Sequence, residues 1–495
     1  MLTPFFLISH AVSKYQGLPS YGYNSTYYFG IACAAWFYLL LALIFLSRTL
    51  RAIGVNDYAV ALTILGISLG TNLFYYSSID VGMSHVYGFF LFSLGLYLTV
   101  KWHEGFRRRH LVLLGFTLGL MTIVRPTNII FMLFPLLYGV KSLSSFKEKM
   151  NVIWRHNNQL LLAIGAFAMV VFVQLLIWKI GTGKWVVYSY DGERFFFDRP
   201  RFWKGLFSYR KGWFVYSPIL LIALVGIVFF FKRNKNILLP FMATTFVLLY
   251  VTLSWWCWWY GGSLGMRSLI ELSAIFALPL GLLFDRLSTK FLFVVPLLLV
   301  ILVVKLNFRF TESFVQGHLH YDSMTKEAYW KIAKKESLDE SYWSLLSRPS
   351  AYNASLGNDE SQPYARNLFK SSSVYVDSLS EFSESFVHLS RDGYFIEKLD
   401  TDLLIETECM VTKPVQDSEC GLVVSLYNYD EEINYNYEIQ VLDSIHQVPG
   451  QWCRVTMQVP FSYVFDEKAD LKVYMWNPKN NEIHLRNIKI TQLVY

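Results

Sequence analysis

The chain has 495 residues, of which 54% are hydrophobic, 18% aromatic and only 16% charged, and its formal net charge is +7. Soluble globular proteins carry roughly 25% charged residues, so this composition argues against an ordinary soluble enzyme. It also excludes a disordered chain, a coiled coil and a small disulfide-rich fold. The mean hydropathy is +0.33, and the long apolar runs end near Leu306. We predict a multi-pass membrane protein with a water-soluble tail.

About ten transmembrane helices are expected, because an apolar helix needs roughly 20 residues to cross the hydrocarbon core. Residues 111–140 are interrupted by Arg125 and Pro126. We interpret them as two short helices in a hairpin, since a charge and a proline at membrane depth need cover from protein or water. The other expected spans are residues 29–46, 58–76, 85–100, 160–180, 213–231, 237–253, 269–284 and 291–306.

Lysine and arginine are concentrated in every second short loop, which predicts that this face is cytoplasmic. The inverted topology would leave five basic loops unexplained. The N-terminus and the C-terminal domain are then expected on the outer side. Residues 2–12 form an amphipathic stretch with no signal peptide before it, so we expect a further span upstream of Met1.

The expected outer loop 181–212 breaks this charge rule. It holds seven basic residues, Arg210 and Lys211 among them, and three acidic ones, including Asp191, so its net charge is 7 − 3 = +4. Guanidinium groups bind phosphate in bidentate fashion, which predicts an anionic ligand at the membrane surface. The alternatives are lipid headgroups or pairing with the carboxylates of the same loop.

The expected outer loop 254–267 is unusually aromatic. Four tryptophans, Trp258 and Trp259 among them, and Tyr260 stand within six positions, and glycines follow that let the backbone approach a ligand closely. Arg267 and Glu271 lie one helical turn apart at the start of the next span. Tryptophans also anchor membrane proteins at the interface, but this density beside a charge pair favours a site for a sugar attached to phosphate.

Three further ionisable residues lie at the same face. Asp80 and His85 flank the start of the span 85–100, and Arg125 ends the first helix of the hairpin. Ionisable groups near the membrane are functional candidates, although a lone His or Asp at an interface is more often simply solvated. The sequence contains no glycine-rich phosphate loop, no nucleophile elbow and no metal-ligand spacing, and the excess of positive charge does not indicate nucleic acid.

The tail is predicted to begin with a helical connection and a linker over residues 307–370, after the membrane domain 1–306. Residues 371–495 then alternate like strands, at 403–410, 421–427, 435–442, 452–459, 470–476 and 483–493. This spacing favours a jelly-roll-like β-sandwich outside the membrane. A carbohydrate-binding module, a structural cap and a protein-contact module all fit the pattern. One disulfide is conceivable there, but spacing assigns none.

Taken together, residues 1–306 resemble the bacterial GT-C membrane glycosyltransferases, and are similar to protein O-mannosyltransferases and lipid A aminoarabinose transferases. The resemblance rests on the many spans and on three segments: RPTN at 125–128, SYRKGWFVYSP at 208–218 and WWYGGSLGMR at 258–267. It implies transfer of a sugar from a polyprenyl-phosphate donor to an acceptor glycan, lipid or protein, on the outer face of a bacterial cytoplasmic membrane. The lipid-linked sugar is the substrate, and no cofactor or metal is implied.

The resemblance also suggests roles for individual residues. Arg267, Arg210, Lys211 and Arg125 would bind the donor phosphate. The residues that would contact lipid or sugar are Trp258, Trp259, Tyr260, Glu271 and Asp191. The general base of the family usually lies in a first outer loop, which this chain is expected to lack together with the first transmembrane helix, so the chain as given is expected to be inactive unless Asp80 or His85 substitutes. A rival from another class is a non-catalytic binder or flippase of lipid-linked glycans.

Overall fold

The computed structural model covers most of the helical part and the strands of the tail. The described residues are 1–188, 195–255, 257–288, 292–321, 323–334, 342, 345–346, 364–370, 373–376, 401–411, 421–428, 433–441, 450–461, 470–476 and 483–494. The chain divides into two compact units, Met1–Asp339 and Glu340–Tyr495. The division into three parts at residues 306 and 370 stays a prediction, and residues 347–363 of the expected connection and linker lie outside the described residues.

In the first half of the helical unit, α2 and α3 each begin after an asparagine whose side chain caps the N-terminus of the helix. The Asn24 side chain accepts a hydrogen bond from the amide of Thr26, and Asn56 does the same for Ala59. The elements are α1 (Thr3–Tyr15), α2 (Ser25–Ala52), α3 (Asp57–Leu69), α4 (Leu73–Ser78), α5 (His85–Gly105), α6 (Arg108–Val124), η1 (Pro126–Met132), α7 (Leu133–Leu137), α8 (Leu143–Arg155) and α9 (Asn157–Thr182).

In the second half, proline divides an expected span. The run 213–231 is broken before Pro218, whose ring cannot continue a helix from the preceding turn. The elements are α10 (Phe202–Phe207), α11 (Trp213–Tyr216), α12 (Pro218–Gly226), α13 (Val228–Lys232), α14 (Lys235–Leu253), η2 (Arg267–Leu269), α15 (Leu272–Leu287), α16 (Val294–Val315) and α17 (Lys326–Lys334).

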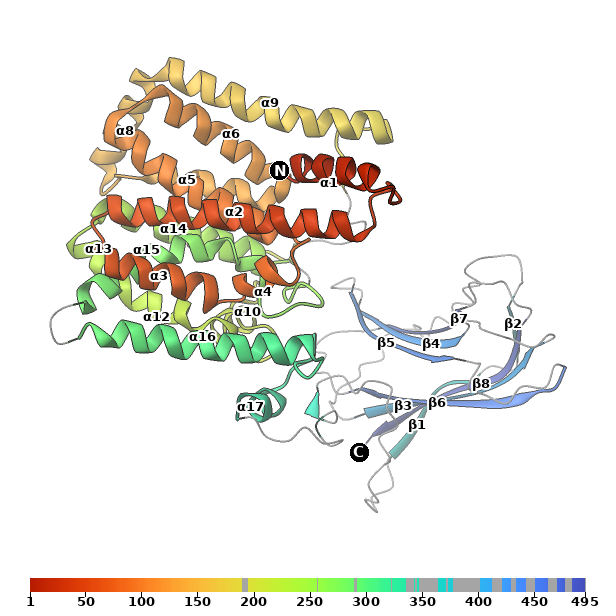
Figure 1. The fold of residues 1–495 in the computed structure, drawn as a ribbon. Helices are drawn as coiled ribbons and strands as arrows, with labels where there is room; N and C mark the ends of the chain where they lie inside the picture. The colour runs from red at the N-terminus through yellow and green to blue at the C-terminus, as the bar shows by residue number, and fades with distance from the viewer. Residues whose placement is uncertain are drawn as a thin grey trace. The chain divides into compact units, whose positions relative to one another are not determined.

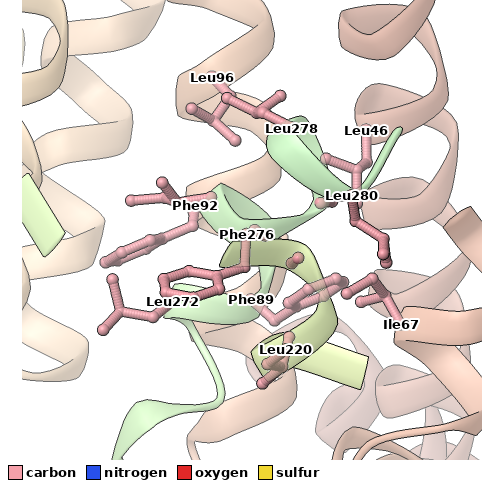
Figure 2. Packing of buried hydrophobic residues seen from close by; sticks show 14 of the residues in the cluster. Leu46, Ile67, Phe89, Phe92, Leu96, Leu220, Leu272, Phe276, Leu278 and Leu280 are labelled. Carbon is pink, nitrogen blue, oxygen red and sulfur yellow. The ribbon is translucent and has the colours of Figure 1, made fainter. Parts of the chain in front are cut away.

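The core of this unit is built around α15. The helices α9, α6, α5, α2, α3 and α16 lie side by side in that order (Figure 1). α15 packs against α2, α3, α5 and α12, and its residues 272–284 are all buried. Figure 2 shows Leu272, Phe276 and Leu280 of α15 among side chains of the other four helices. This packing fixes the N-terminal end of α15, where Glu271 lies.

Helices able to cross a membrane are present among the described residues, although the expected number is not confirmed. Within the described residues, four helices are long and apolar enough to cross a membrane: α2, α9, α14 and α16. Shorter apolar helices occupy Asp57–Leu69, Pro126–Leu137 and Pro218–Lys232. These apolar helices support the prediction of a helical membrane protein, and the number of about ten spans stays a prediction. Glycine and proline interrupt the helices in the runs 58–76 and 213–231.

The C-terminal unit consists of antiparallel strands. The six predicted strands are present as β3 (Thr401–Val411), β4 (Gly421–Asn428), β5 (Ile433–Val441), β6 (Cys453–Phe461), β7 (Asp470–Trp476) and β8 (Ile483–Val494), and β1 (Tyr364–Lys370) and β2 (Ser373–Val376) precede them. One sheet has the order β1-β8-β3-β6, with β2 also paired to β8, and the other has the order β5-β4-β7. The jelly roll itself is not confirmed.

Candidate functional site

Three ionisable side chains that are distant in sequence meet inside the helical unit. His85 Nδ1 lies 3.2 Å from Oε1 of Glu271, and Arg125 Nη1 lies 3.3 Å from the same oxygen. Their side chains are 7%, 4% and 18% exposed for His85, Glu271 and Arg125. Arg125 also donates to the carbonyl of Ser268 at 3.1 Å. The sequence nominated all three residues separately, and the fold brings them together.

Local backbone structure explains how each side chain reaches this point. Arg125 precedes Pro126, whose ring disfavours a helical conformation in the preceding residue. It accordingly adopts φ −152° and ψ 118°, which ends α6 and turns the guanidinium away from the helix. His85 is the first residue of α5, and Glu271 is the residue that caps α15. The cluster therefore lies where three helices begin or end.

Gly88 allows this approach. A Cβ atom at this position would lie 2.6 Å from Cγ and 2.8 Å from Oε1 of Glu271, closer than real Cβ atoms come to other atoms. Gly88 follows His85 by about one turn of α5, so the two residues face the same neighbour. The glycine thus lets the carboxylate lie directly against the backbone of α5.

The electrostatics of the cluster are unusual for its depth. A buried carboxylate is costly unless it is paired and hydrogen-bonded, and Arg125 and His85 supply such partners on one oxygen. The other oxygen, Glu271 Oε2, is buried and has no hydrogen-bond partner among the described residues. A carboxylate left half satisfied in a low-dielectric site is a feature of binding and catalytic centres.

The two expected outer loops contact each other. Phe195 pairs with Trp255 in an isolated antiparallel bridge, and the amide of Phe196 donates to the carbonyl of Ser254 at 2.6 Å. Arg210 stacks on the ring of Trp259, with its Cζ 4.0 Å from the ring centroid. The two expected outer loops, 181–212 and 254–267, therefore pack against each other.

The aromatic loop also reaches the ionisable cluster. The Cζ of Arg125 lies 5.8 Å from the ring centroid of Tyr260, within the range of a cation–π interaction. Trp258 and Trp259 are 8% and 7% exposed, so their rings are covered by protein. This burial disfavours the alternative that these two tryptophans form a lipid-facing belt.

Lys211 is placed differently from the phosphate ligand that the sequence suggested. It is 1% exposed, and its amine donates to the carbonyl oxygens of Ser263 and Tyr321. These contacts connect the loop 181–212 to the glycine-rich residues 261–265 and to the residues that follow α16. A structural role explains Lys211 better than ligand binding does, because backbone carbonyls satisfy its ammonium group.

The sequence also suggested Arg267, Asp80 and Asp191 as site residues. Arg267 is half-buried, and its Nη1 lies 3.8 Å from the sulfur of Met83. Asp80 is half-buried, and its carboxylate has no hydrogen bond or ion pair with the part of the chain that the structure describes. Asp191 lies outside the described residues.

A small pocket beside Glu271 was not predicted from the sequence. Its walls come from α5, η1, α14, η2 and the start of α15, and the lining residues are Phe92, Thr127, Asn128, Leu248, Thr252, Ser268, Leu269, Glu271 and Leu272. The signals for it in the sequence were Glu271 and the RPTN segment, which contains Thr127 and Asn128. Among the described residues, no group of three or more His, Cys, Asp or Glu side chains is placed to hold a metal ion.

Comparison with known proteins gives distant matches only. No family model matches the chain, and no curated protein does. The structure is similar to that of the Archaeoglobus fulgidus oligosaccharyltransferase in complex with zinc and sulfate, with 16% identity, a TM-score of 0.37, and coverage of 73% of this chain and 51% of that chain. For the same archaeal enzyme with an inhibitory peptide and a dolichol-phosphate, the identity is 13%, the TM-score 0.36 and the coverage 73% and 53%.

The chain thus spans about half the length of these solved structures. A likeness with so low a TM-score is too distant to assign a fold family or an activity. The functional conclusion has to come from the residues of the site.

Proposed function

We propose that this chain is a membrane glycosyltransferase of the GT-C type. It would move a sugar from a polyprenyl-phosphate donor to an acceptor glycan, lipid or protein on the outer face of a bacterial cytoplasmic membrane. The supporting observation is the buried Glu271, which holds His85 and Arg125 on one oxygen where apolar helices meet the aromatic loop. A base, positive charge and aromatic surface in one place match the needs of this reaction.

The chemistry assigns a role to each member of the cluster. An acceptor hydroxyl attacks the anomeric carbon of the sugar, the bond from that carbon to the phosphate oxygen breaks, and the phosphate leaves with its lipid. With the proton of His85 on Nδ1 directed at Glu271, Nε2 is the atom that accepts the proton of the acceptor hydroxyl. Glu271 is then a positioning residue, as the carboxylate is in a catalytic triad.

Positive charge for the departing phosphate comes from arginines around the cluster. Arg125 lies in it, and Arg267 precedes Glu271 by four residues. Preorganised cations in a site shielded from water stabilise developing negative charge far more than they do in water. Arg210 contributes through its stacking on Trp259. The half-buried Tyr260 provides aromatic surface for sugar or lipid, and the covered rings of Trp258 and Trp259 pack together behind it. A sugar-contacting role for Asp191 stays a prediction from the resemblance.

Asp80 is the competing base, because its carboxylate is partly exposed and has no side-chain partner in the described residues. Two single variants, His85→Asn and Asp80→Asn, separate the possibilities in membranes that contain the chain and a labelled polyprenyl-phosphate sugar. General-base catalysis contributes roughly 100-fold to 10,000-fold. We expect His85→Asn to lose transfer to that extent and Asp80→Asn to retain it.

Ser273→Ala is the matched control, since Ser273 is a buried polar residue of α15 that does not line the pocket. It should transfer like the wild type. Loss of activity in Asp80→Asn with full activity in His85→Asn would reassign the base. Full activity in both variants would contradict a role as general base for His85 and for Asp80.

A further inference from the structure

Three buried polar atoms of residues that line the pocket beside Glu271 have no hydrogen-bond partner within the part of the chain that the structure describes. They are Nδ2 of Asn128, Oγ of Ser268 and Oε2 of Glu271. The three residues are 3%, 6% and 3% exposed, so bulk water does not satisfy them. A buried polar group without a partner destabilises the folded state unless a ligand or a water molecule satisfies it. Three such atoms around one pocket indicate a polar group that binds among them.

The chemistry of the three atoms restricts what that group can be. A carboxylate oxygen accepts only, an amide nitrogen donates only, and a serine hydroxyl does both. A phosphate or carboxylate ligand would be repelled by Glu271. A metal cation or an ammonium group would meet the amide hydrogens of Asn128 and the positive charge of Arg125. A neutral group that both donates and accepts satisfies all three atoms, and a hydroxyl is such a group.

The rest of the lining fits a hydroxyl carried on carbon. The pocket has a volume of about 10 Å³, which is room for a single group the size of a hydroxyl. Phe92, Leu248, Leu269 and Leu272 supply apolar wall around it. Glu271 connects the pocket to the proposed reacting centre. Its Oε1 contacts His85, and its Oε2, which has no partner among the described residues, is the oxygen that can accept a hydrogen bond from a group in the pocket.

We propose that this pocket recognises a free hydroxyl group of the donor sugar. The proposal rests on the proposed glycosyltransferase function and adds to it that the donor carries a neutral hydroxyl at the position that enters the pocket. A donor that lacks this hydroxyl leaves the three polar atoms unsatisfied and is a poor substrate, which is how a site that hydrogen-bonds a hydroxyl discriminates.

The test compares donors and variants in one design. Polyprenyl-phosphate glucose, mannose and galactose are first offered to the full chain in proteoliposomes, and the donor that is transferred is then compared with its monodeoxy analogues. The variants are Asn128→Ala and Ser268→Ala, with Ser273→Ala as the control, whose hydroxyl is also buried and unpartnered but lies outside the pocket lining. Thermal unfolding in detergent shows whether each variant is folded.

For the wild type and Ser273→Ala, we expect one monodeoxy analogue to be transferred about 10- to 100-fold less efficiently than its parent. In Asn128→Ala and Ser268→Ala, this difference should shrink several-fold, because the parent sugar loses a partner that the analogue never had. Equal transfer of all analogues by the wild type, or an unchanged preference in both pocket variants, would overturn the hydroxyl subsite and leave the glycosyltransferase proposal standing. Failure of the wild type to transfer any of the three sugars would instead count against both.

Discussion

Replacing Gly88 with alanine tests whether the position of Glu271 depends on close contact with α5. The new Cβ would lie 2.6 Å from Cγ of Glu271, whereas ordinary contacts begin at 3.4 Å, so the carboxylate side chain has to move by about 3.4 − 2.6 = 0.8 Å. The contacts of Glu271 to His85 and Arg125 are already 3.2 and 3.3 Å long. A shift of this size takes them beyond hydrogen-bond range.

The expected effect on stability is the difference of two opposing effects. Overpacking costs about 1–3 kcal/mol, and alanine is favoured over glycine in a helix by about 0.5–1 kcal/mol. We expect a net loss of about 1 kcal/mol, measured by thermal unfolding in detergent, together with a much larger loss of transfer. Gly165→Ala in α9 is the matched control, since no atom lies within 4 Å of the added Cβ, and it should be neutral or stabilising.

A double-mutant cycle gives the decisive comparison. In a Glu271→Ala background the atom that the new methyl group strikes is absent, so Gly88→Ala should cost less there than in the wild type. An equal cost in the two backgrounds, or full transfer activity in Gly88→Ala, would refute the reasoning that Gly88 positions Glu271.

Three further predictions concern other parts of the molecule. Arg267→Ala should reduce transfer by roughly 100-fold or more with little change in thermal unfolding. The control, Lys147→Ala on the expected cytoplasmic face, should leave transfer unchanged. Retained activity in Arg267→Ala would exclude a role for Arg267 at the phosphate. Burial lowers the pKa of Lys149 on α8 from 10.5 to about 8. Between these pH values the unfolded chain binds more protons than the folded one, so the free energy of unfolding should rise as the pH increases from about 8 to 10.5. A pH series of thermal unfolding should show this rise in the wild type and not in Lys149→Met. Cys409 and Cys453 are free thiols directly opposite each other on β3 and β6, where Cβ atoms lie about 4.5–5.5 Å apart, so a mild oxidant should join them in a disulfide detectable by mass spectrometry, and thiols that both stay reduced would contradict this.

The composition of the chain was enough to predict apolar membrane helices and a water-soluble tail, and the alternating pattern predicted the strands β3 to β8 within that tail. The division of the apolar runs into separate helices was harder to predict, because hydropathy does not respond to a single backbone break. Pro218 divides an apolar run of full length, and the run 58–76 contains Gly70, after which α3 gives way to α4. Helix geometry at such points depends on packing against neighbours, which the sequence does not display.

The site was predictable as a set of residues but not as an arrangement. His85, Arg125 and Glu271 attracted attention because charges near a membrane are rare, yet the residues that touch are 186 and 146 positions apart in the chain. Lys211 shows the opposite case. A lysine in a cationic loop predicts an anionic ligand, and only the fold reveals that backbone carbonyls surround it.

The most direct test of the proposed reaction is the release of polyprenyl phosphate from a lipid-linked sugar by the full chain in proteoliposomes. Transfer breaks the bond between sugar and phosphate, so we predict one polyprenyl phosphate released for each sugar that appears on an acceptor, and almost none in His85→Asn. Binding of the lipid-linked sugar, or its movement between leaflets, with no release of polyprenyl phosphate would contradict the enzyme and identify the chain as a binder or flippase.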